Sequence, residues 1–218
     1  MANHTMEHAI PHHFETAEQA YDAAKLGVWL FMVTEVLMFG GLFCAYIVFR
    51  SLYPDMFDAA SQHLNRVLGG INTVALICSS LTMARAVNWT RHDEHRKAQK
   101  MLLATLFFAC VFMVIKYFEY THKIHEGLLP GAHFHFEGLK HPKTPLFFSL
   151  YFMMTGLHGV HVLTGMILIF WIFLKSRKGA FSSKYYTPVE LVGIFWHLVD
   201  LVWIYLFPLL YLIGQAHG

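Results

Sequence analysis

Residues Leu26–Phe49 read LGVWLFMVTEVLMFGGLFCAYIVF, an apolar run of 24 residues that contains one carboxyl side chain, Glu35, and no basic residue. A helix needs about 20 predominantly apolar residues to cross the hydrocarbon core of a bilayer. Four further runs reach or approach this length: Val67–Val87, Met101–Phe118, Leu146–Leu174 and Val189–Ile213. Because a chain inside lipid must satisfy its own backbone hydrogen bonds, such runs form helices. The sequence therefore predicts an all-α integral membrane bundle of five transmembrane helices.

The composition favours a membrane protein over a soluble one. Hydrophobic residues make up 56% of the chain and charged residues 14%, whereas a soluble domain averages about 25% charged residues. The formal net charge of +2 gives no basic surface for nucleic acid, so we expect no nucleic-acid partner. A chain of 218 residues has room for one compact unit. We therefore expect a single five-helix membrane domain over residues 17–218.

Residues 1–16 are polar and rich in histidine, and we interpret them as a tail outside the bundle. Its histidines could bind a metal adventitiously, but a solvated polar tail is the favoured interpretation. They are His4, His8, His12 and His13.

Local signals mark several helix ends. Thr16–Gln19 reads TAEQ, which has the form of a capping box and predicts a helix that begins near Ala17. The third helix is expected to continue past its apolar run to about Glu126. Pro208 lies inside the last run, where proline removes a backbone donor and should kink the helix.

The basic residues predict the orientation, because Lys and Arg concentrate in cytoplasmic loops. With five spans, the amino terminus shares its side of the membrane with the second and fourth loops. Ten basic residues lie on that side: Lys25, Arg85, Arg91, Arg96, Lys97, Lys100, Lys175, Arg177, Lys178 and Lys184. Five lie on the other: Arg50, Arg66, Lys123, Lys140 and Lys143. The amino terminus and the tail are therefore predicted to be cytoplasmic and the carboxyl terminus outside.

Glu35 sits near the middle of the first span, where an ionised side chain costs several kcal/mol unless it has a partner. Two interpretations of this carboxyl stay open. It could be a neutral group hydrogen-bonded within the bundle, or it could contact a lipid head group or a proton path.

Further polar residues recur at helical spacing in the later spans. His158 and His161 are three residues apart, as are His197 and Asp200, so each pair shares a helix face. These four side chains could form a metal or haem site. We favour an interhelical polar cluster that binds no metal.

The third span carries one further polar pair. Lys116 and Glu119 are also three residues apart and are predicted to form an ion pair near the outer boundary.

Taken together, these motifs resemble the cytochrome c oxidase subunit III family. The stretch Gly27–Phe39, with Trp29 and Glu35, resembles its first retained helix, and the similarity runs to about Leu212 in the family's order. The other matching motifs are Asn72-Thr73 with Ser79-Ser80, Phe118-Glu119-Tyr120, Thr155–Val162 and Trp196–Trp203. Longer family members have two more helices at the amino terminus, so this chain is similar to the short bacterial form.

The resemblance implies a multi-pass protein of the bacterial cytoplasmic membrane that has no catalytic residues, haem or copper of its own. Haem and copper are expected in the partner, subunit I, beside which this subunit packs together with other oxidase subunits. The chain is expected to hold phospholipid and to support proton uptake by a proton-pumping cytochrome c oxidase. Glu35 corresponds to the family's buried carboxyl that faces a lipid cleft, and Lys175 to a basic head-group contact that is commonly Arg.

Alternative functions remain open at this stage. A quinol oxidase or a nitric oxide reductase has a related subunit, although the quinol branch tends to have Asp where this chain has Glu35. A histidine-ligated membrane haem protein is an alternative from another class. A small transporter is disfavoured, because five spans cannot divide into paired repeats.

Overall fold

The computed structural model describes residues 16–130, 143–183 and 185–212. The described chain is helical, and its one β-feature is an isolated bridge between Ser182 and Tyr185. The elements are α1 (Ala17–Leu52), α2 (Pro54–Ser61), α3 (Arg66–Arg91), α4 (His95–His125), α5 (Thr144–Arg177), α6 (Thr187–Phe207) and the π-helix η1 (Pro208–Leu212). Five of the helices are long and apolar enough to cross a membrane. The predicted fold class is confirmed.

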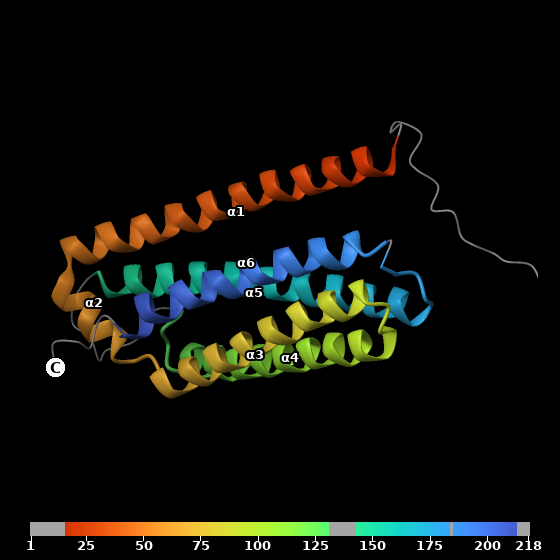
Figure 1. Cartoon of the computed structure of the whole chain (residues 1–218). Coiled ribbons are helices and arrows are strands. Elements are labelled where there is room, and N and C mark those ends of the chain that lie inside the picture. The colour runs from red at the N-terminus through yellow and green to blue at the C-terminus, as the bar shows by residue number, and fades with distance from the viewer. Residues whose placement is uncertain (1–15, 131–142, 184, 213–218) are drawn as a thin grey trace, which may run out of the picture.

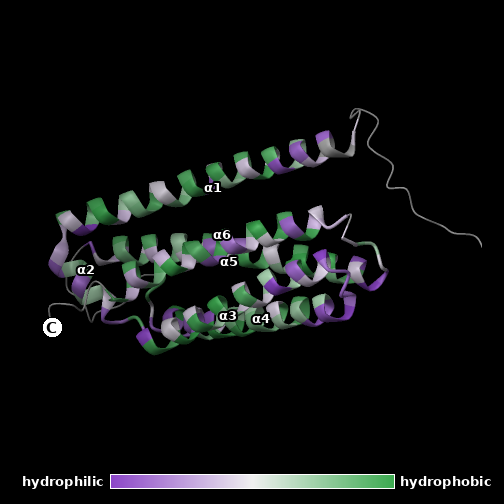
Figure 2. Cartoon of the chain, viewed as in Figure 1, coloured by the Kyte–Doolittle hydropathy of each residue, from purple (hydrophilic) through white to green (hydrophobic). Residues whose placement is uncertain are grey.

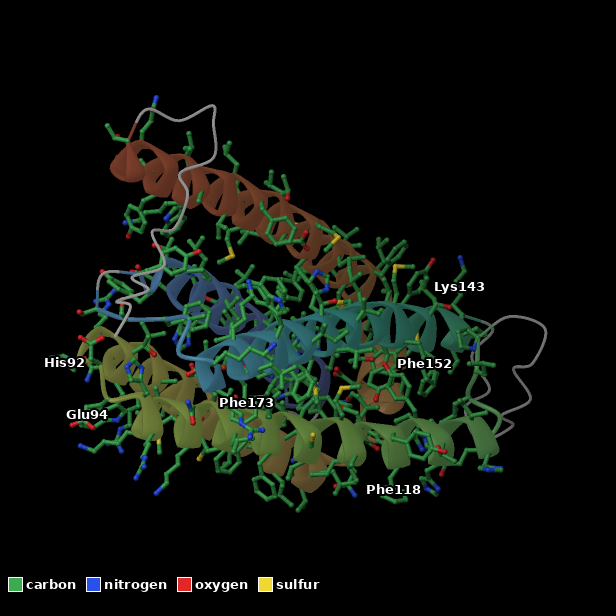
Figure 3. The ribbon with its side chains drawn as sticks, turned by 90° about the vertical axis from the view of Figure 1, so that its right-hand side faces the viewer. His92, Glu94, Phe118, Lys143, Phe152 and Phe173 are labelled. Carbon is green, nitrogen blue, oxygen red and sulfur yellow. The ribbon has the colours of Figure 1, made fainter. Side chains whose placement is uncertain are left out.

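The long helices lie side by side and alternate in direction (Figure 1). The α1–α2–α3 connections lie at one end of the bundle, which we call the α2 end, and the α3–α4 and α5–α6 connections lie at the opposite end. Figure 3 places His92 and Glu94 at this opposite end and Lys143 at the α2 end. Figure 2 shows hydrophilic residues gathered toward the helix ends and hydrophobic ones between them. The start of α1 and the end of η1 therefore lie on opposite sides of the membrane that the bundle would cross.

The last span is the central helix of the bundle, and α1 is peripheral. Half of the apolar stretch of Thr187–Leu212 is buried, against 17% of that of Tyr21–Leu52. Lipid provides no hydrophobic force between helices, so close backbone approach matters. Gly165 of α5 supplies it, because a Cβ there would lie 2.6 Å from a ring carbon of Trp196 in α6.

The structure adds one helix that the apolar runs do not predict. Pro54 opens α2 at a first-turn position, where its missing N–H costs no helical hydrogen bond. The Phe57 ring of α2 packs edge-on against Tyr46 and Phe147, with centroids 5.2 and 5.4 Å away. Because α2 has only eight residues, it is too short to show a hydropathy signal of its own.

The helix ends follow their local signals. Thr16 caps α1, its side-chain oxygen accepting a hydrogen bond from the Gln19 N–H at 3.1 Å. Helix α4 ends at His125, with Glu126 as its cap. At Pro208 the last span changes from α- to π-helix, and the kink expected there stays a prediction. Apart from Thr16, the predicted tail over residues 1–16 lies outside the described residues.

Candidate functional site

Glu35 and His161 are hydrogen-bonded in the middle of the membrane-spanning region. His161 Nε2 lies 2.8 Å from Glu35 Oε2, and its Nδ1 lies 2.8 Å from the Leu157 carbonyl oxygen. A carbonyl oxygen only accepts, so Nδ1 carries a proton. Nε2 then either donates to an ionised Glu35 or accepts from a protonated one. In both cases a proton shared by the two side chains holds α1 against α5.

This pair opens into a groove of about 410 Å³ between α1, α5 and α6. The side chains of Glu35 and His161 are 13% and 15% exposed. The rest of the groove is nearly all apolar, lined by Val28, Phe31, Val160, Thr164, Leu168, Leu191, Val192 and Phe195. A groove with apolar walls and one polar pair can hold a hydrocarbon chain and can orient a polar group near its centre.

The structure does not gather His158, His161, His197 and Asp200 into one hydrogen-bonded cluster: His161 bonds Glu35 of α1, whereas His197 and Asp200 both lie beside Ser80 of α3. His197 Nδ1 lies 2.6 Å from Ser80 Oγ, and the His158 ring packs between Phe112 and Trp203. Three steps of about 100° leave the two side chains about 60° apart on the same side of α5, and this offset directs His161 toward α1 and His158 toward α4 and α6.

Asp200, the fourth member of that set, is buried and faces α3. Its nearest polar neighbours are Ser79 and Ser80. Within the part of the chain that the structure describes, no group of three or more His, Cys, Asp or Glu side chains is arranged to hold a metal ion. The absence of a metal at these residues stays a prediction.

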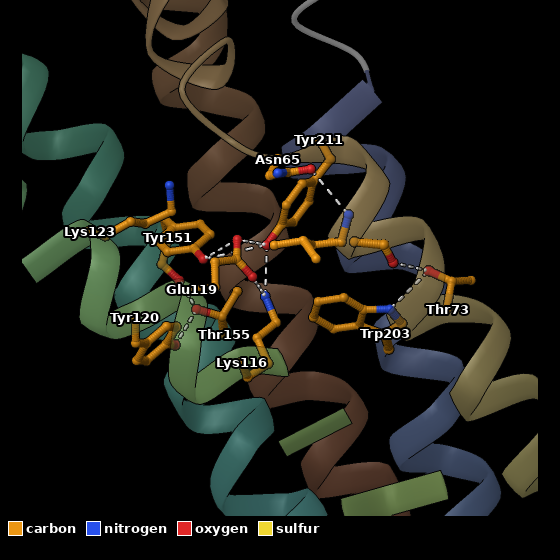
Figure 4. A network of polar contacts seen from close by, with 12 residues as sticks. Asn65, Thr73, Lys116, Glu119, Tyr120, Lys123, Tyr151, Thr155, Trp203 and Tyr211 are labelled. Atoms are coloured by element: carbon orange, nitrogen blue, oxygen red, sulfur yellow. Dashed lines mark hydrogen bonds and ion pairs between the residues drawn. The ribbon is translucent and has the colours of Figure 1, made fainter. Parts of the chain in front are cut away.

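Lys116 and Glu119 form a buried ion pair that two tyrosines complete (Figure 4). Lys116 Nζ donates to Glu119 Oε2 at 2.8 Å and to the Tyr211 hydroxyl at 2.7 Å. The Tyr211 and Tyr151 hydroxyls both donate to Glu119 Oε1, at 2.6 and 2.9 Å. The side chains of Lys116 and Glu119 are only 9% and 3% exposed. Sequence reasoning found the pair but missed the tyrosines, which come from α5 and η1.

A polar vestibule of about 500 Å³ leads from the α2 end toward this ion pair. Glu119 and Lys123 of α4 line it, and Lys123 Nζ also donates to the His63 carbonyl oxygen at 3.0 Å. The other lining residues include Gln62, Asn65, His122 and Glu126. The buried carboxylate therefore forms part of the wall of a space that opens at the membrane surface.

Two further polar contacts lie at the end of the bundle that holds the α3–α4 and α5–α6 connections. Lys175 is exposed near the end of α5, with its Nζ 4.3 Å from the centroid of the Trp171 ring. Glu190 of α6 joins three helices, because it accepts from Arg91 of α3 at 2.7 Å and from Tyr21 of α1 at 3.3 Å. Sequence reasoning missed Glu190, which has no helical-spacing partner to reveal it.

Comparisons with known proteins agree with this arrangement. The family model described as cytochrome c oxidase subunit III matches residues 6–215. The chain is 35% identical to cytochrome c oxidase subunit 3 of Synechocystis sp. over 193 residues, which cover 88% of this chain and 76% of the relative. It is 31% identical to cytochrome c oxidase subunit 3 of Thermostichus vulcanus over 200 residues, 91% of this chain and 92% of the relative. A probable quinol oxidase subunit 3 of Staphylococcus epidermidis is 26% identical over 201 residues, 89% of this chain and 90% of the relative.

These matches cover nearly the whole chain and two of them exceed 30% identity. With the five apolar helices they indicate a multi-pass membrane protein in a multi-subunit oxidase, an oxidoreductase complex of respiratory electron transport. The chain therefore belongs to the cytochrome c oxidase subunit III family and is a subunit III of a haem–copper oxidase.

Proposed function

We propose that this chain supports its oxidase without carrying electrons: it packs directly against subunit I, holds phospholipid beside it and sustains proton uptake. Haem and copper then reside in the partner subunits, and this chain has no catalytic centre of its own. The observation that supports the proposal is the groove at Glu35 and His161, whose apolar walls can hold a hydrocarbon chain.

The placement of Lys175 supports lipid binding in this groove. His161, Leu168 and Lys175 are spaced by seven residues, so they follow one face of α5. At 1.5 Å per residue, Lys175 lies about 10 Å beyond Leu168, toward the membrane surface. A lipid whose phosphate sits near Lys175 would lay an acyl chain along the groove toward Glu35. Where the family commonly has Arg, Lys175 keeps the positive charge but cannot bind phosphate in a bidentate way.

The exposed face of α1 supports direct packing against subunit I. Its outward side chains include Leu30, Val33, Leu37 and Ile47, all more than half exposed. Such a face needs either lipid or another membrane helix beside it. We assign the single membrane domain to residues 17–218, with the tail of residues 1–16 on the cytoplasmic side of a bacterial cytoplasmic membrane.

Cytochrome c is the proposed electron donor of the complex. The relatives named cytochrome c oxidase are 35% and 31% identical to this chain, against 26% for the probable quinol oxidase subunit. A quinol oxidase is the second candidate, and the donor that reduces the purified complex decides between them.

An absorbance spectrum of this subunit, after mild separation from its partners, tests its non-redox role. The proposal expects no Soret band in the isolated chain and all haem absorbance in the partner fraction. A Soret band that stays with the chain and is lost in His158→Ala or His161→Ala would instead show a histidine-ligated haem.

A further inference from the structure

Trp203 organises a polar layer in the middle of the bundle. Its ring is fully buried, and its Nε1 donates to Thr73 Oγ1 of α3 at 3.0 Å (Figure 4). The His158 ring lies beside it with centroids 5.3 Å apart, and Lys116 Nζ lies 4.5 Å from its ring centroid. Groups from α3, α4 and α5 thus meet around one residue of α6.

Three buried side chains at this level have no hydrogen-bond partner in the described part of the protein. They are Asn72, next to Thr73; His158, beside Trp203; and Asp200, one turn before Trp203. Asn72 and His158 are 0% exposed and Asp200 is 3% exposed. Both polar side-chain atoms of each residue lack a well-aligned hydrogen bond, so α3, α5 and α6 each bring one such side chain into the interior of the bundle.

Neighbouring protein groups satisfy these atoms only in part: the Ser80 and Ser79 hydroxyls interact with Asp200, but neither makes a well-aligned hydrogen bond with its carboxyl oxygens. The Ser79 hydroxyl, close to Asp200, already donates to the Leu76 carbonyl oxygen at 2.7 Å and accepts from Trp196 Nε1 at 3.1 Å. The Ser80 hydroxyl is bonded to His197 at 2.6 Å. Leaving a buried donor or acceptor unpaired costs about 1–3 kcal/mol, and buried polar groups in native proteins are nearly always paired with protein or water.

A polar route connects this layer with the surface at the α2 end. The vestibule reaches Glu119, which is bonded to Lys116 and Tyr211. Lys116 and Tyr211 both border Trp203, the Tyr211 ring centroid lying 6.3 Å from that of Trp203. Contacts between polar side chains therefore continue from the vestibule through Glu119 and Lys116 to the ring of Trp203.

We propose that the interior of this subunit binds water molecules that bridge Asn72, His158 and Asp200 and exchange with the α2 end through the vestibule. Each water can make two to four hydrogen bonds, which matches the mixture of amide, ring nitrogen and carboxyl groups here. The bound ligand is water, and with it protons gain a hydrogen-bonded route between the membrane surface and Asp200. This inference concerns the core of α3–α6 and does not depend on lipid in the groove beside α1.

The first test is a density map of the whole oxidase at a resolution that shows ordered water. The proposal expects water peaks within hydrogen-bonding distance of a carboxyl oxygen of Asp200 and of a ring nitrogen of His158. Direct bonds from Asp200 to Ser79 or Ser80, with side chains filling the layer and no water density, would overturn it.

The second test is infrared spectroscopy of the same complex. Subtracting the spectrum of Asp200→Asn identifies the Asp200 band, and Glu190→Gln at the opposite end is the control that should leave this band in place. On transfer to D₂O the C=O band of protonated Asp200, or the side-chain amide band of Asn72 identified in the same way with Asn72→Leu, should shift promptly in the wild type, because exchangeable water reaches these groups; an ionised carboxylate has no hydrogen to exchange. A band that does not shift until the protein is unfolded would show a dry, closed layer and refute the proposal.

Discussion

Glu35 and His161, 126 positions apart in the chain, are joined by a 2.8 Å hydrogen bond between the first and fourth membrane-spanning helices. This bond fastens α1, the least buried of the five spans, to the rest of the bundle. It also gives the mid-membrane carboxyl a partner inside the protein. The polar contact and the apolar groove around it form one structural unit.

Removing His161 should loosen α1. In His161→Leu, Glu35 keeps its place but loses its partner, and leaving a buried donor or acceptor unpaired costs about 1–3 kcal/mol. We expect earlier thermal dissociation of the subunit from the purified oxidase. Thr164→Val, which lines the same groove, is the control, because Thr164 bonds only its own helix at Val160. Equal losses in both variants would show that the bond to Glu35 contributes nothing specific.

The buried ion pair should show strong coupling. Lys116→Met leaves the Glu119 carboxylate without its cation and should destabilise the subunit by about 3–5 kcal/mol. The double variant Lys116→Met/Glu119→Gln should regain most of this loss, because it removes both charges. Thermal unfolding of Lys116→Met, of Glu119→Gln and of the double variant measures the coupling energy between the two side chains. Losses that simply add would mean that the two charges act independently.

Lys175 should retain anionic lipid. A basic group near an anionic surface contributes about 1 kcal/mol, which is roughly fivefold in the binding constant of the lipid. Lys175→Ala should therefore lower the amount of anionic phospholipid that native mass spectrometry detects on the purified complex. Lys97→Ala at the same end is the control, since Lys97 is paired with Glu94 at 3.1 Å. Unchanged lipid in Lys175→Ala would remove Lys175 from the lipid site.

Asp93 should make the opposite end of the bundle sensitive to acid. Its carboxylate accepts from the Ser183 N–H at 2.7 Å, and hydrogen bonds from the Ser183 side chain and from this backbone N–H lower the pKa of Asp93 below its ordinary value of 3.8. A lowered pKa means that the stabilisation is present above pH 3.8 and is lost as the pH falls through the lower folded-state value. Asp93→Asn keeps a residue that tolerates the positive φ of 57° but cannot titrate.

Limited proteolysis of the α3–α4 and α5–α6 connections, measured over a range of pH, tests this effect. The wild type should become more susceptible to cleavage below pH 3.8, whereas Asp93→Asn should show a flat profile over the same range. A wild-type profile identical to that of the variant would contradict the assignment.

Features with a strong local signal could be predicted from the sequence. The apolar runs identified all five spans, and the capping residue Thr16 placed the start of α1. The three-residue spacing of Lys116 and Glu119 predicts their ion pair from within one helix. These predictions succeed because each depends on hydropathy or helical spacing within one segment.

Contacts between helices could not be predicted in this way. Nothing in the sequence near Glu35 points to His161, and Tyr211, in the π-helix that follows α6, is 92 positions away from Glu119. The set of His158, His161, His197 and Asp200 divided, with His161 bonded to Glu35 of α1 and with His197 and Asp200 beside Ser80 of α3. Spacing fixes the face of a helix but leaves open which helix that face meets.

The most direct measurement of the central claim is turnover of the oxidase after this subunit has been removed, followed over time. A supporting subunit predicts that oxygen reduction starts near its normal rate, because the haems and copper of the partner are intact. Activity or proton coupling should then decline faster than in the complete complex. Immediate and complete loss of oxygen reduction, with the haem and copper content of the partner unchanged, would contradict the account.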